Sequence, residues 1–333
     1  MNVLSGASRS LLDAVAPPER RGLDRDAVRL LVTDRAAGTH SHARFFQLPA
    51  FLRTGDVLVV NDSATLPAAL RARRINGEAL PLHVATMVDP RLWMAEPRGT
   101  VLCGEELRLP GRASAVMIAP VEPEQPRLWY AWFGLPLPMY AYLAVHGEPI
   151  RYGYVTQKFP LSDYQTMFAR ETGSSEMPSA ARPFTVRTVN ALQQRGIEIV
   201  TITLHCGLAS MERPERPGPE RYAVSYEAAA ALNPARSEGR RAIAVGTTAV
   251  RALESSLQRG RVVPSAGWTD LVIDERHVVR SVDGLLSGFH AAGATHQSIL
   301  RAFLDSDLLS TAYDQAAMHG YYQHEFGDVH LIL

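Results

Sequence analysis

Two short, wholly apolar runs place the strongest limit on the fold of this 333-residue chain. Val57–Val60 lies between Gly55 and Asn61, and Ala242–Val245 ends at Gly246. Four consecutive apolar residues enclosed by turn-forming residues are typical of a strand that is buried on both faces. Such strands belong mainly to parallel sheets that helices cover on both sides. The two runs therefore favour an α/β fold with a mostly parallel sheet and flanking helices.

Strand and helix patterns alternate along the rest of this predicted domain. Ile197–Leu204 contains alternating β-branched residues and is expected to form a strand. Thr185 stands in front of a helix-like segment, Val186–Arg195, where a helix N-cap would stand. Four more elements are expected, namely a strand at Val28–Val32, a helix through Val250, Leu253 and Leu257, a strand at Val278–Leu286 and a helix at Thr295–Phe303.

The segment 66–150 has a different character. Short apolar runs such as Leu80–Met87 and Leu128–Phe133 alternate there with Gly and Pro, without a helical period. Short strands at this spacing are typical of a small β-sandwich or barrel. The stretch Leu135-Pro136-Leu137-Pro138 marks its end, because proline cannot occupy a central strand. We therefore predict an α/β main domain formed by 1–65 and 151–333, with a small β-barrel domain inserted at 66–150.

Charge and cysteine content restrict the class of protein. Lys+Arg and Asp+Glu are both 34, so the chain lacks the basic excess that is usual in proteins that grip nucleic-acid phosphates. The two cysteines, Cys103 and Cys206, show no metal-ligand spacing and cannot form a disulfide framework. No run approaches the roughly 20 apolar residues that span a bilayer, and no secretory signal is evident. We expect a cytoplasmic monomer that uses no metal and no membrane, with no obligate protein partner indicated.

Three predicted strand ends carry polar groups. In open α/β sheets, ligands bind beyond the carboxyl ends of the strands, which makes such positions candidate sites. They are Asn61-Asp62, His205-Cys206-Gly207 and Gly246-Thr247-Thr248.

The third of these ends is the most informative, because a Gly-Thr-Thr turn there opens a helix. The free N–H groups of a helix N-terminus attract carboxylates and phosphates. Arg251 and Glu254, three residues apart, would share one face of that helix, turned away from its apolar stripe. Two interpretations stay open at this stage: an anion clamp, or a capped helix with a surface ion pair.

Single residues elsewhere also have two interpretations each. His205 and His290 could act as acid or base, or could be hydrogen-bonded inside the core. Asp163, within Asp163-Tyr164-Gln165, could be catalytic or a turn residue. Four aromatic residues near the C-terminus could stack on a base or simply pack: Tyr313, Tyr321, Tyr322 and Phe326. No GxGxxG, P-loop or Gly-x-Ser-x-Gly motif is present.

An ordered series of segments, spread from about Pro17 to Ile332, resembles the S-adenosylmethionine:tRNA ribosyltransferase-isomerase family of the queuosine pathway. No single segment would be specific, but the set in this order is. The segments include Pro18-Glu19-Arg20, Arg29-Leu30-Leu31, Asn61-Asp62, Leu66-Pro67-Ala68, Leu135-Pro136-Leu137-Pro138, Tyr164-Gln165-Thr166, Thr203-Leu204-His205, Ala242–Arg251, Phe289-His290 and Phe326-Gly327-Asp328.

This resemblance implies an α/β domain with an inserted β-barrel and an enzyme that uses S-adenosylmethionine as a ribosyl donor. The ribosyl group would be transferred to a 7-deazaguanine base in tRNA and isomerised, with release of adenine and methionine. S-adenosylmethionine would be a co-substrate, and no metal is implied. The candidate catalytic residues are then His205, His290 and Asp163, and the candidate S-adenosylmethionine-binding residues are Gly207, Gly246, Thr247, Thr248, Arg251, Glu254, Asn61, Tyr164 and Gln165.

The sequence also departs from the family pattern at several loops. Where the family has Gly-Leu-His-Phe, this chain has Ala181-Arg182-Pro183-Phe184, so a histidine is replaced. The segments after Gly207 and after His290 differ as well. Two alternatives therefore stand beside the tRNA reaction. One is a paralogue, a lyase or isomerase, that uses S-adenosylmethionine on a small molecule, and the other is a non-catalytic S-adenosylmethionine-binding protein.

Overall fold

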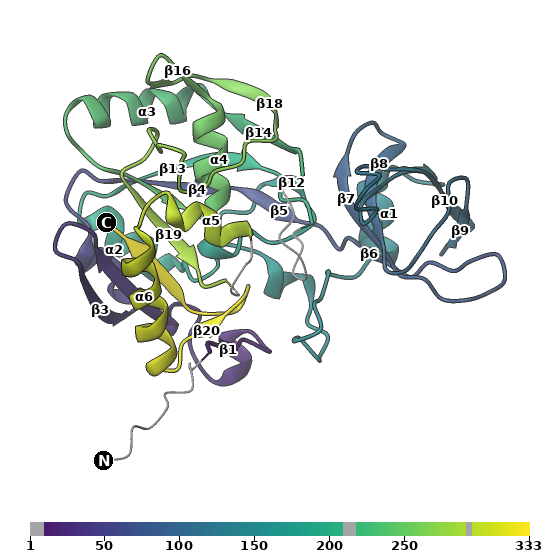
Figure 1. Cartoon of the computed structure of the whole chain (residues 1–333), viewed down its shortest axis with the longest axis horizontal. Helices are drawn as coiled ribbons and strands as arrows, with labels where there is room; N and C mark the ends of the chain where they lie inside the picture. The colour runs from purple at the N-terminus through teal and green to yellow at the C-terminus, as the bar shows by residue number, and fades with distance from the viewer. Residues whose placement is uncertain (1–9, 209–217, 291–294) are drawn as a thin grey trace.

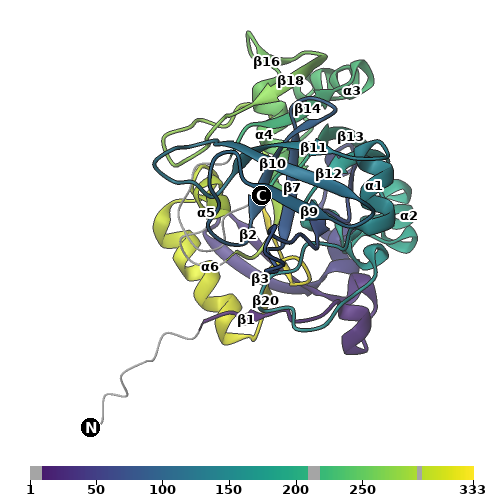
Figure 2. The ribbon, with the colours of Figure 1, turned by 90° about the vertical axis from the view of Figure 1, so that its right-hand side faces the viewer.

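The structure is a computed structural model that describes residues 10–208, 218–290 and 295–333. Figure 1 shows a larger body of helices and strands, with a smaller module of strands standing beside it. In Figure 2 this module faces the viewer and lies in front of the main sheet. Within the described residues no helix has the length and apolar character needed to cross a bilayer.

The main body is built on a nine-stranded sheet. At its centre β13 (Glu198–Leu204), β4 (Val57–Asn61), β15 (Ala242–Val245) and β19 (Gly284–Gly288) lie in this order and pair in parallel with one another. Further out, β21 (Val329–Ile332) and β2 (Arg29–Asp34) also pair in parallel. The remaining pairs are antiparallel, so parallel pairing is concentrated in the middle of the sheet. In sheet order the strands are β18 (Ser265–Thr269), β14 (Glu220–Val224), β13 (Glu198–Leu204), β4 (Val57–Asn61), β15 (Ala242–Val245), β19 (Gly284–Gly288), β21 (Val329–Ile332), β2 (Arg29–Asp34) and β3 (Thr39–Arg44).

The two apolar runs of the sequence form the adjacent strands β4 and β15, and every residue of both is buried. Their side chains alternate between two cores, as the two-residue period of a strand requires. Val57 and Val59 belong to one core, whereas Leu58 and Val60 belong to the other. A strand with no polar face can lie only where both sides are covered, so these two runs define the centre of the sheet.

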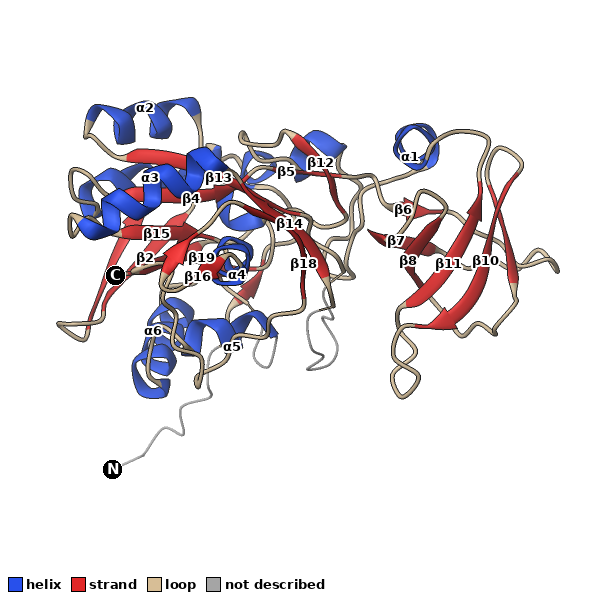
Figure 3. Ribbon diagram, turned by 90° about the horizontal axis from the view of Figure 1, so that it is seen from above, coloured by secondary structure: helices blue, strands red, loops and turns tan. Residues whose placement is uncertain are grey.

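Helices cover both faces of this sheet. One core takes α2 (Val186–Gln194) with the 3-10 helices at Phe45–Phe51 and Ser179–Ala181. The other takes α3 (Tyr226–Ser237), α4 (Thr247–Ser255), α5 (Thr295–Arg301) and part of α6 (Ser306–Met318). Figure 3 shows α2 and α6 on opposite sides of the strands.

Several elements agree with the sequence patterns. The Thr185 hydroxyl accepts a hydrogen bond from the Thr188 N–H (3.2 Å) and caps α2 as predicted. The helix predicted through Val250, Leu253 and Leu257 is α4, which ends at Ser255. Leu257 instead begins the short strand β16 (Leu257–Gln258), which pairs with β17 (Arg261–Val262). The strand predicted over Val278–Leu286 begins only at Gly284. Helix α3 was not predicted.

The smaller module contains six antiparallel strands and one helix. Arg73, three residues after the first strand, and Arg108 of the last strand exchange two backbone hydrogen bonds (2.9 and 2.7 Å). In sheet order the strands are β6 (Ala69–Leu70), β7 (Leu82–Met87), β8 (Leu92–Pro97), β11 (Trp129–Gly134), β10 (Ala113–Pro120) and β9 (Glu106–Leu109).

The core of this module extends along the chain from Leu66 to Ile150, with one contribution from Leu208. We therefore keep 66–150 as a proposed inserted domain, and its closure into a β-barrel stays a prediction. Helix α1 (Met139–His146) of this module is a further helix that the sequence patterns do not predict. It buries Met139, Tyr142 and Leu143.

Short elements complete the described chain. Two of them bring distant segments together: β5 (Ser63–Thr65) pairs in parallel with β12 (Glu171–Ser174), and β1 (Leu12–Asp13) pairs with β20 (Tyr322–Gln323). The other short elements are 3-10 helices at Pro18–Arg21, Arg25–Ala27 and Leu161–Tyr164.

A buried histidine lies on β21 of the main sheet. His330 of β21 is 1% exposed, and its Nε2 lies 2.7 Å from the Thr33 hydroxyl. That hydroxyl also lies 2.9 Å from Nδ1 of His40. Burial, with a smaller contribution from His40, lowers the pKa of His330 to about 3. The imidazole is therefore neutral in the folded protein down to a pH at which it would be charged in an unfolded chain.

We predict that this histidine destabilises the fold in acid. The pKa of His330 is lower in the folded protein than in the unfolded chain. Its contribution to the free energy of unfolding is therefore complete above about pH 6.5 and is lost as the pH falls from there toward 3. His330→Gln keeps a donor for Thr33 but cannot titrate. Urea unfolding between pH 6 and 4.5 should then show a slope of stability against pH that is smaller by about 1.4 kcal/mol per pH unit. A parental slope in His330→Gln would contradict this account.

Candidate active site

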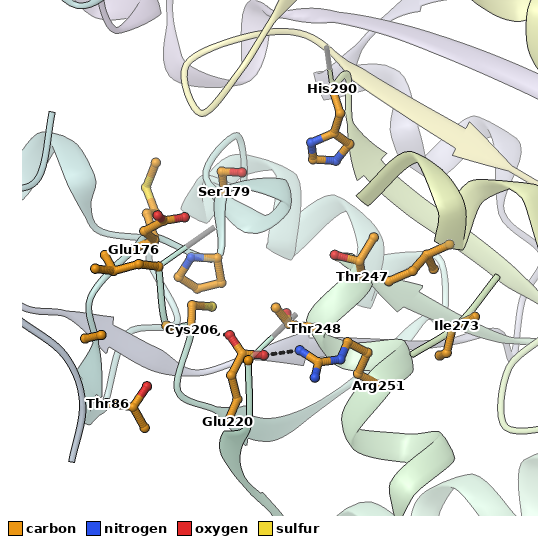
Figure 4. A pocket seen from close by; sticks show the side chains of 18 of the residues that line it. Thr86, Glu176, Ser179, Cys206, Glu220, Thr247, Thr248, Arg251, Ile273 and His290 are labelled. Carbon is orange, nitrogen blue, oxygen red and sulfur yellow. Dashed lines mark hydrogen bonds and ion pairs between the residues drawn. The ribbon is translucent and has the colours of Figure 1, made fainter. Parts of the chain in front are cut away.

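A cavity of about 270 Å³ lies between the main domain and the inserted module (Figure 4). One side of the cavity is formed by the segments that follow β13 and β15 and by the last residues of β19. The cavity therefore lies at the carboxyl ends of central parallel strands. The inserted module contributes the opposite side. Its lining residues there are Ala85, Thr86, Met94, Arg127 and Leu128.

The N-terminus of α4 forms one wall of the cavity. Gly246 has φ of +92°, a conformation that side chains rarely adopt, and it links β15 directly to the helix. Because glycine offers no capping group, the first N–H groups of the helix stay available at the wall formed by Gly246, Thr247 and Thr248. This end of the helix suits a carboxylate or a phosphate.

Asn61 fixes this helix end without lining the cavity. Its side-chain N–H donates to the Leu204 carbonyl (2.8 Å) and to the Thr248 hydroxyl (3.2 Å). Its amide oxygen accepts from the N–H groups of Leu204 and Ser63. One buried amide therefore joins the ends of β4 and β13 to the first turn of α4.

Arg251 and Glu220 form an ion pair in the cavity wall (Figure 4). The Arg251 guanidinium also donates to the carbonyls of Leu271 (3.0 Å) and Thr269 (3.4 Å). The other carboxylate oxygen of Glu220 accepts from the Gly207 N–H (2.7 Å). The side chain of Arg251 is 5% exposed, its charge is paired with Glu220, and each of its three nitrogens donates one hydrogen bond inside the protein.

His290, Glu176 and Cys206 also line the cavity. His290 lies with Nε2 at 3.3 Å from the Ser287 hydroxyl, and its backbone N–H donates to the Tyr313 hydroxyl (3.4 Å). Glu176 accepts a hydrogen bond from the Tyr152 hydroxyl. Burial raises the pKa of the Cys206 thiol far above its ordinary value, so this group is neutral and a poor nucleophile.

Known proteins resemble this chain over almost its whole length. Residues 10–332 match the family described as queuosine biosynthesis protein. The chain belongs to the queuosine biosynthesis protein family. It is 36% identical to an S-adenosylmethionine:tRNA ribosyltransferase-isomerase of Thermus thermophilus, over 95% of this chain and 97% of that one. The enzyme of the same name from Moorella thermoacetica is 35% identical over 93% and 94%. A crystal structure of S-adenosylmethionine tRNA ribosyltransferase from Thermotoga maritima matches with a TM-score of 0.56 and 27% identity, over 97% of this chain and 96% of that one.

The cavity of this queuosine family member contains half of the residues that the sequence suggested. Those brought together there are Gly207, Gly246, Thr247, Thr248, Arg251 and His290. His205, Asp163, Glu254, Asn61, Tyr164 and Gln165 lie outside its lining, and any role they have in catalysis or binding stays a prediction.

His205 faces away from the cavity because of strand alternation. Cys206 points into the cavity, so His205, one residue earlier, points to the other face of the sheet. There its Nδ1 lies 2.7 Å from the Ser63 hydroxyl, and its ring packs where a Cβ on Gly173 would stand. Burial first, and then Arg221, lower the pKa of this imidazole.

Glu254 does not pair with Arg251 as one interpretation expected. It accepts hydrogen bonds from His277 Nε2 (2.9 Å) and from the N–H groups of Arg280 and Ser281 (2.8 and 2.7 Å). Burial acts most strongly, to raise its pKa, but these hydrogen bonds together lower it. Both charged residues of α4 are thus structural ties rather than an exposed pair.

The Asp163-Tyr164-Gln165 segment supports neighbouring loops. Gln165 pairs through its side-chain amide with both backbone groups of Thr65 (2.9 and 2.8 Å). Tyr164 packs in a small core against Phe326. Asp163 lies 3.4 Å from the Arg20 guanidinium, and its carbonyl accepts from Arg182.

Sequence reasoning missed much of the polar lining. Glu176 comes two residues after β12, so the rule of strand ends would have found it if β12 had been predicted. Glu220 is the first residue of β14, a strand that the sequence patterns do not predict. The missed residues that line the cavity include Thr86, Arg127, Glu176, Ser179 and Glu220.

We predict that Arg251→Met lowers the free energy of unfolding by about 3 kcal/mol, because it leaves the Glu220 carboxylate buried without its counterion. The double variant Arg251→Met/Glu220→Gln should recover most of that loss. Urea unfolding of the single and double variants at neutral pH measures both values. Equal stability of Arg251→Met and the parent protein would show that the pair has no structural role.

Proposed function

We propose that this protein transfers the ribosyl group of S-adenosylmethionine to a 7-deazaguanine base in tRNA and isomerises it, with release of adenine and methionine. The observation that carries this proposal is the position of the cavity. It stands at a helix N-terminus and at the ends of parallel strands, between the two modules of a chain that shares its family with the named relatives.

The reaction sets three demands on the protein. A base must remove a proton from the ribose carbon that the adjacent sulfonium acidifies. Donors must hold the methionine carboxylate, and further donors must stabilise the departing adenine. The cavity is lined by polar groups from several elements, so different groups are available for each of these demands.

The N-terminus of α4 is the proposed site for the methionine carboxylate. Gly246, Thr247 and Thr248 line the cavity, and no side chain caps this end of the helix. Asn61 holds this turn in place. Arg251, whose guanidinium is occupied by Glu220 and two carbonyls, is then a positioning residue and not the carboxylate clamp.

His290 is the proposed acid or base of the cavity. It alone of the two candidate histidines lines the cavity, at the end of β19. Ser287, on the same strand, orients its ring. Imidazole is suited to proton transfer at neutral pH because its ordinary pKa is close to that pH.

The proposal predicts that the purified protein releases adenine from S-adenosylmethionine only when a tRNA with the 7-aminomethyl-7-deazaguanine base is added. Adenine can be followed by liquid chromatography, with unmodified tRNA as the matched control. Binding of that tRNA should weaken only slightly as salt rises, because the chain carries no basic excess. Binding of S-adenosylmethionine without release of adenine for any acceptor would refute the tRNA reaction.

Two histidine variants separate the cavity from the opposite face of the sheet. His290→Asn should reduce turnover by about 10²–10⁴-fold, the usual size of a general acid–base contribution, with S-adenosylmethionine affinity nearly retained. His205→Asn should affect turnover far less. Single-turnover adenine release and calorimetry on the same samples decide the matter, and a larger loss in His205→Asn would reverse the assignment.

A further inference from the structure

The face of the sheet opposite the cavity carries an exposed arginine–tryptophan pair. Arg221 of β14 and Trp268 of β18 are directly opposite each other in the strand register. The Arg221 guanidinium carbon lies 6.0 Å from the centre of the Trp268 ring. Trp268 is 46% exposed, and Arg221 is exposed as well. Strand β18 is the last strand on this side of the sheet, so the pair stands at a sheet edge.

Two further rings belong to this region. The His205 backbone N–H donates to the Arg221 carbonyl (2.9 Å), and the charge of Arg221 partly offsets the burial that raises the pKa of Tyr140. Tyr140 comes from α1 of the inserted module and is 38% exposed. Within the described parts of the chain, no carboxylate lies at ion-pair distance from Arg221. The guanidinium is thus exposed beside the Trp268 ring, although it comes from the same strand as a cavity residue.

This face adjoins the cavity through consecutive residues. Glu220 lines the cavity and Arg221 follows it on β14, so the two side chains point to opposite faces of one strand. Arg221 and Trp268 each lie one residue from the end of their strand. Figure 3 shows these ends of β14 and β18 directed toward the inserted module. The pair therefore stands at the same rim of the sheet as the cavity.

We propose that Trp268, Arg221 and Tyr140 form a docking face for unpaired nucleotides of the tRNA loop that delivers its base to the cavity. This inference rests on the proposed function, because it needs an RNA acceptor. Unpaired bases stack on aromatic side chains and on guanidinium planes, and a guanidinium can also pair with a phosphate. An exposed Trp, an exposed Tyr and an exposed Arg provide both kinds of contact.

The net charge of zero fits such a face. Proteins that hold nucleic acid mainly through phosphates need many basic residues, and their affinity falls steeply with salt. Stacking on a few rings needs no basic excess and tolerates salt better. A balanced chain of 34 basic and 34 acidic residues can thus bind a single-stranded loop through this face. The contact would be local, at the nucleotides that flank the reacting base.

Binding of a fluorescently labelled anticodon stem–loop RNA, followed by anisotropy, tests the proposal. Trp268→Ala should raise the Kd by about 5- to 150-fold, the range for loss of one stacked base. Arg221→Ala should raise it by a similar factor, and Arg221→Lys should recover only part of the loss because an ammonium does not stack. Trp132→Ala is the matched control, since Trp132 is 44% exposed but lies on β11 of the inserted module. Its Kd should equal that of the parent.

Three results would overturn the docking face. One is a parental Kd for Trp268→Ala and Arg221→Ala, another is the absence of any RNA binding by the parent, and a third is an equal loss in Trp132→Ala. A change of sedimentation mass in Trp268→Ala would assign the face to a second copy of the chain and would overturn it as well. S-adenosylmethionine affinity should be parental in all variants, which confirms that they fold.

Turnover measured beside binding separates this inference from the proposed function. If the parent releases adenine with tRNA and the variants keep its KM for tRNA, the docking face is wrong and the function stands. If the parent binds the RNA through this face but releases no adenine, the docking face stands and the function is wrong.

Discussion

The ion pair between Arg251 and Glu220 is the interaction on which the geometry of the cavity depends. It joins α4 to β14, and the same guanidinium holds the carbonyls of Leu271 and Thr269. Through Glu220 it also fixes Gly207, whose lack of a side chain allows Thr86 of the inserted module to approach. One buried charge pair therefore determines how the helix end, the sheet edge and the inserted module face one another.

A second constraint is the two-residue period of the strands at the rim. Cys206 and Glu220 point into the cavity, and their neighbours His205 and Arg221 point to the opposite face. The same two strands thus supply a polar cavity on one side and an exposed ring-and-guanidinium face on the other. This arrangement lets a small ligand and a large acceptor approach neighbouring parts of one rim without competing for the same side chains.

The sequence predicted the centre of the sheet because its signal there is local. Val57–Val60 and Ala242–Val245 have no polar face, and the Gly-Thr-Thr turn lies directly at the cavity wall. The parity of His205 could not be predicted, because a one-residue shift in a strand changes the face of every side chain. The partner of Arg251 is Glu220, 31 residues away on β14. Glu254, three residues along the helix, contacts His277 instead. Pro136 and Pro138 predict the end of a strand region, but they do not predict that helix α1 follows.

Binding of S-adenosylmethionine at the N-terminus of α4 is the central claim. Calorimetry with S-adenosylmethionine and with its decarboxylated analogue tests it directly, because the two ligands differ only in the carboxylate that the Gly246–Thr248 turn would hold. A charge-assisted hydrogen bond contributes about 1.5–3 kcal/mol, so the analogue should bind at least about 10-fold more weakly. Equal affinity of the two ligands would contradict the account, since the helix end would then have no role in holding the ligand.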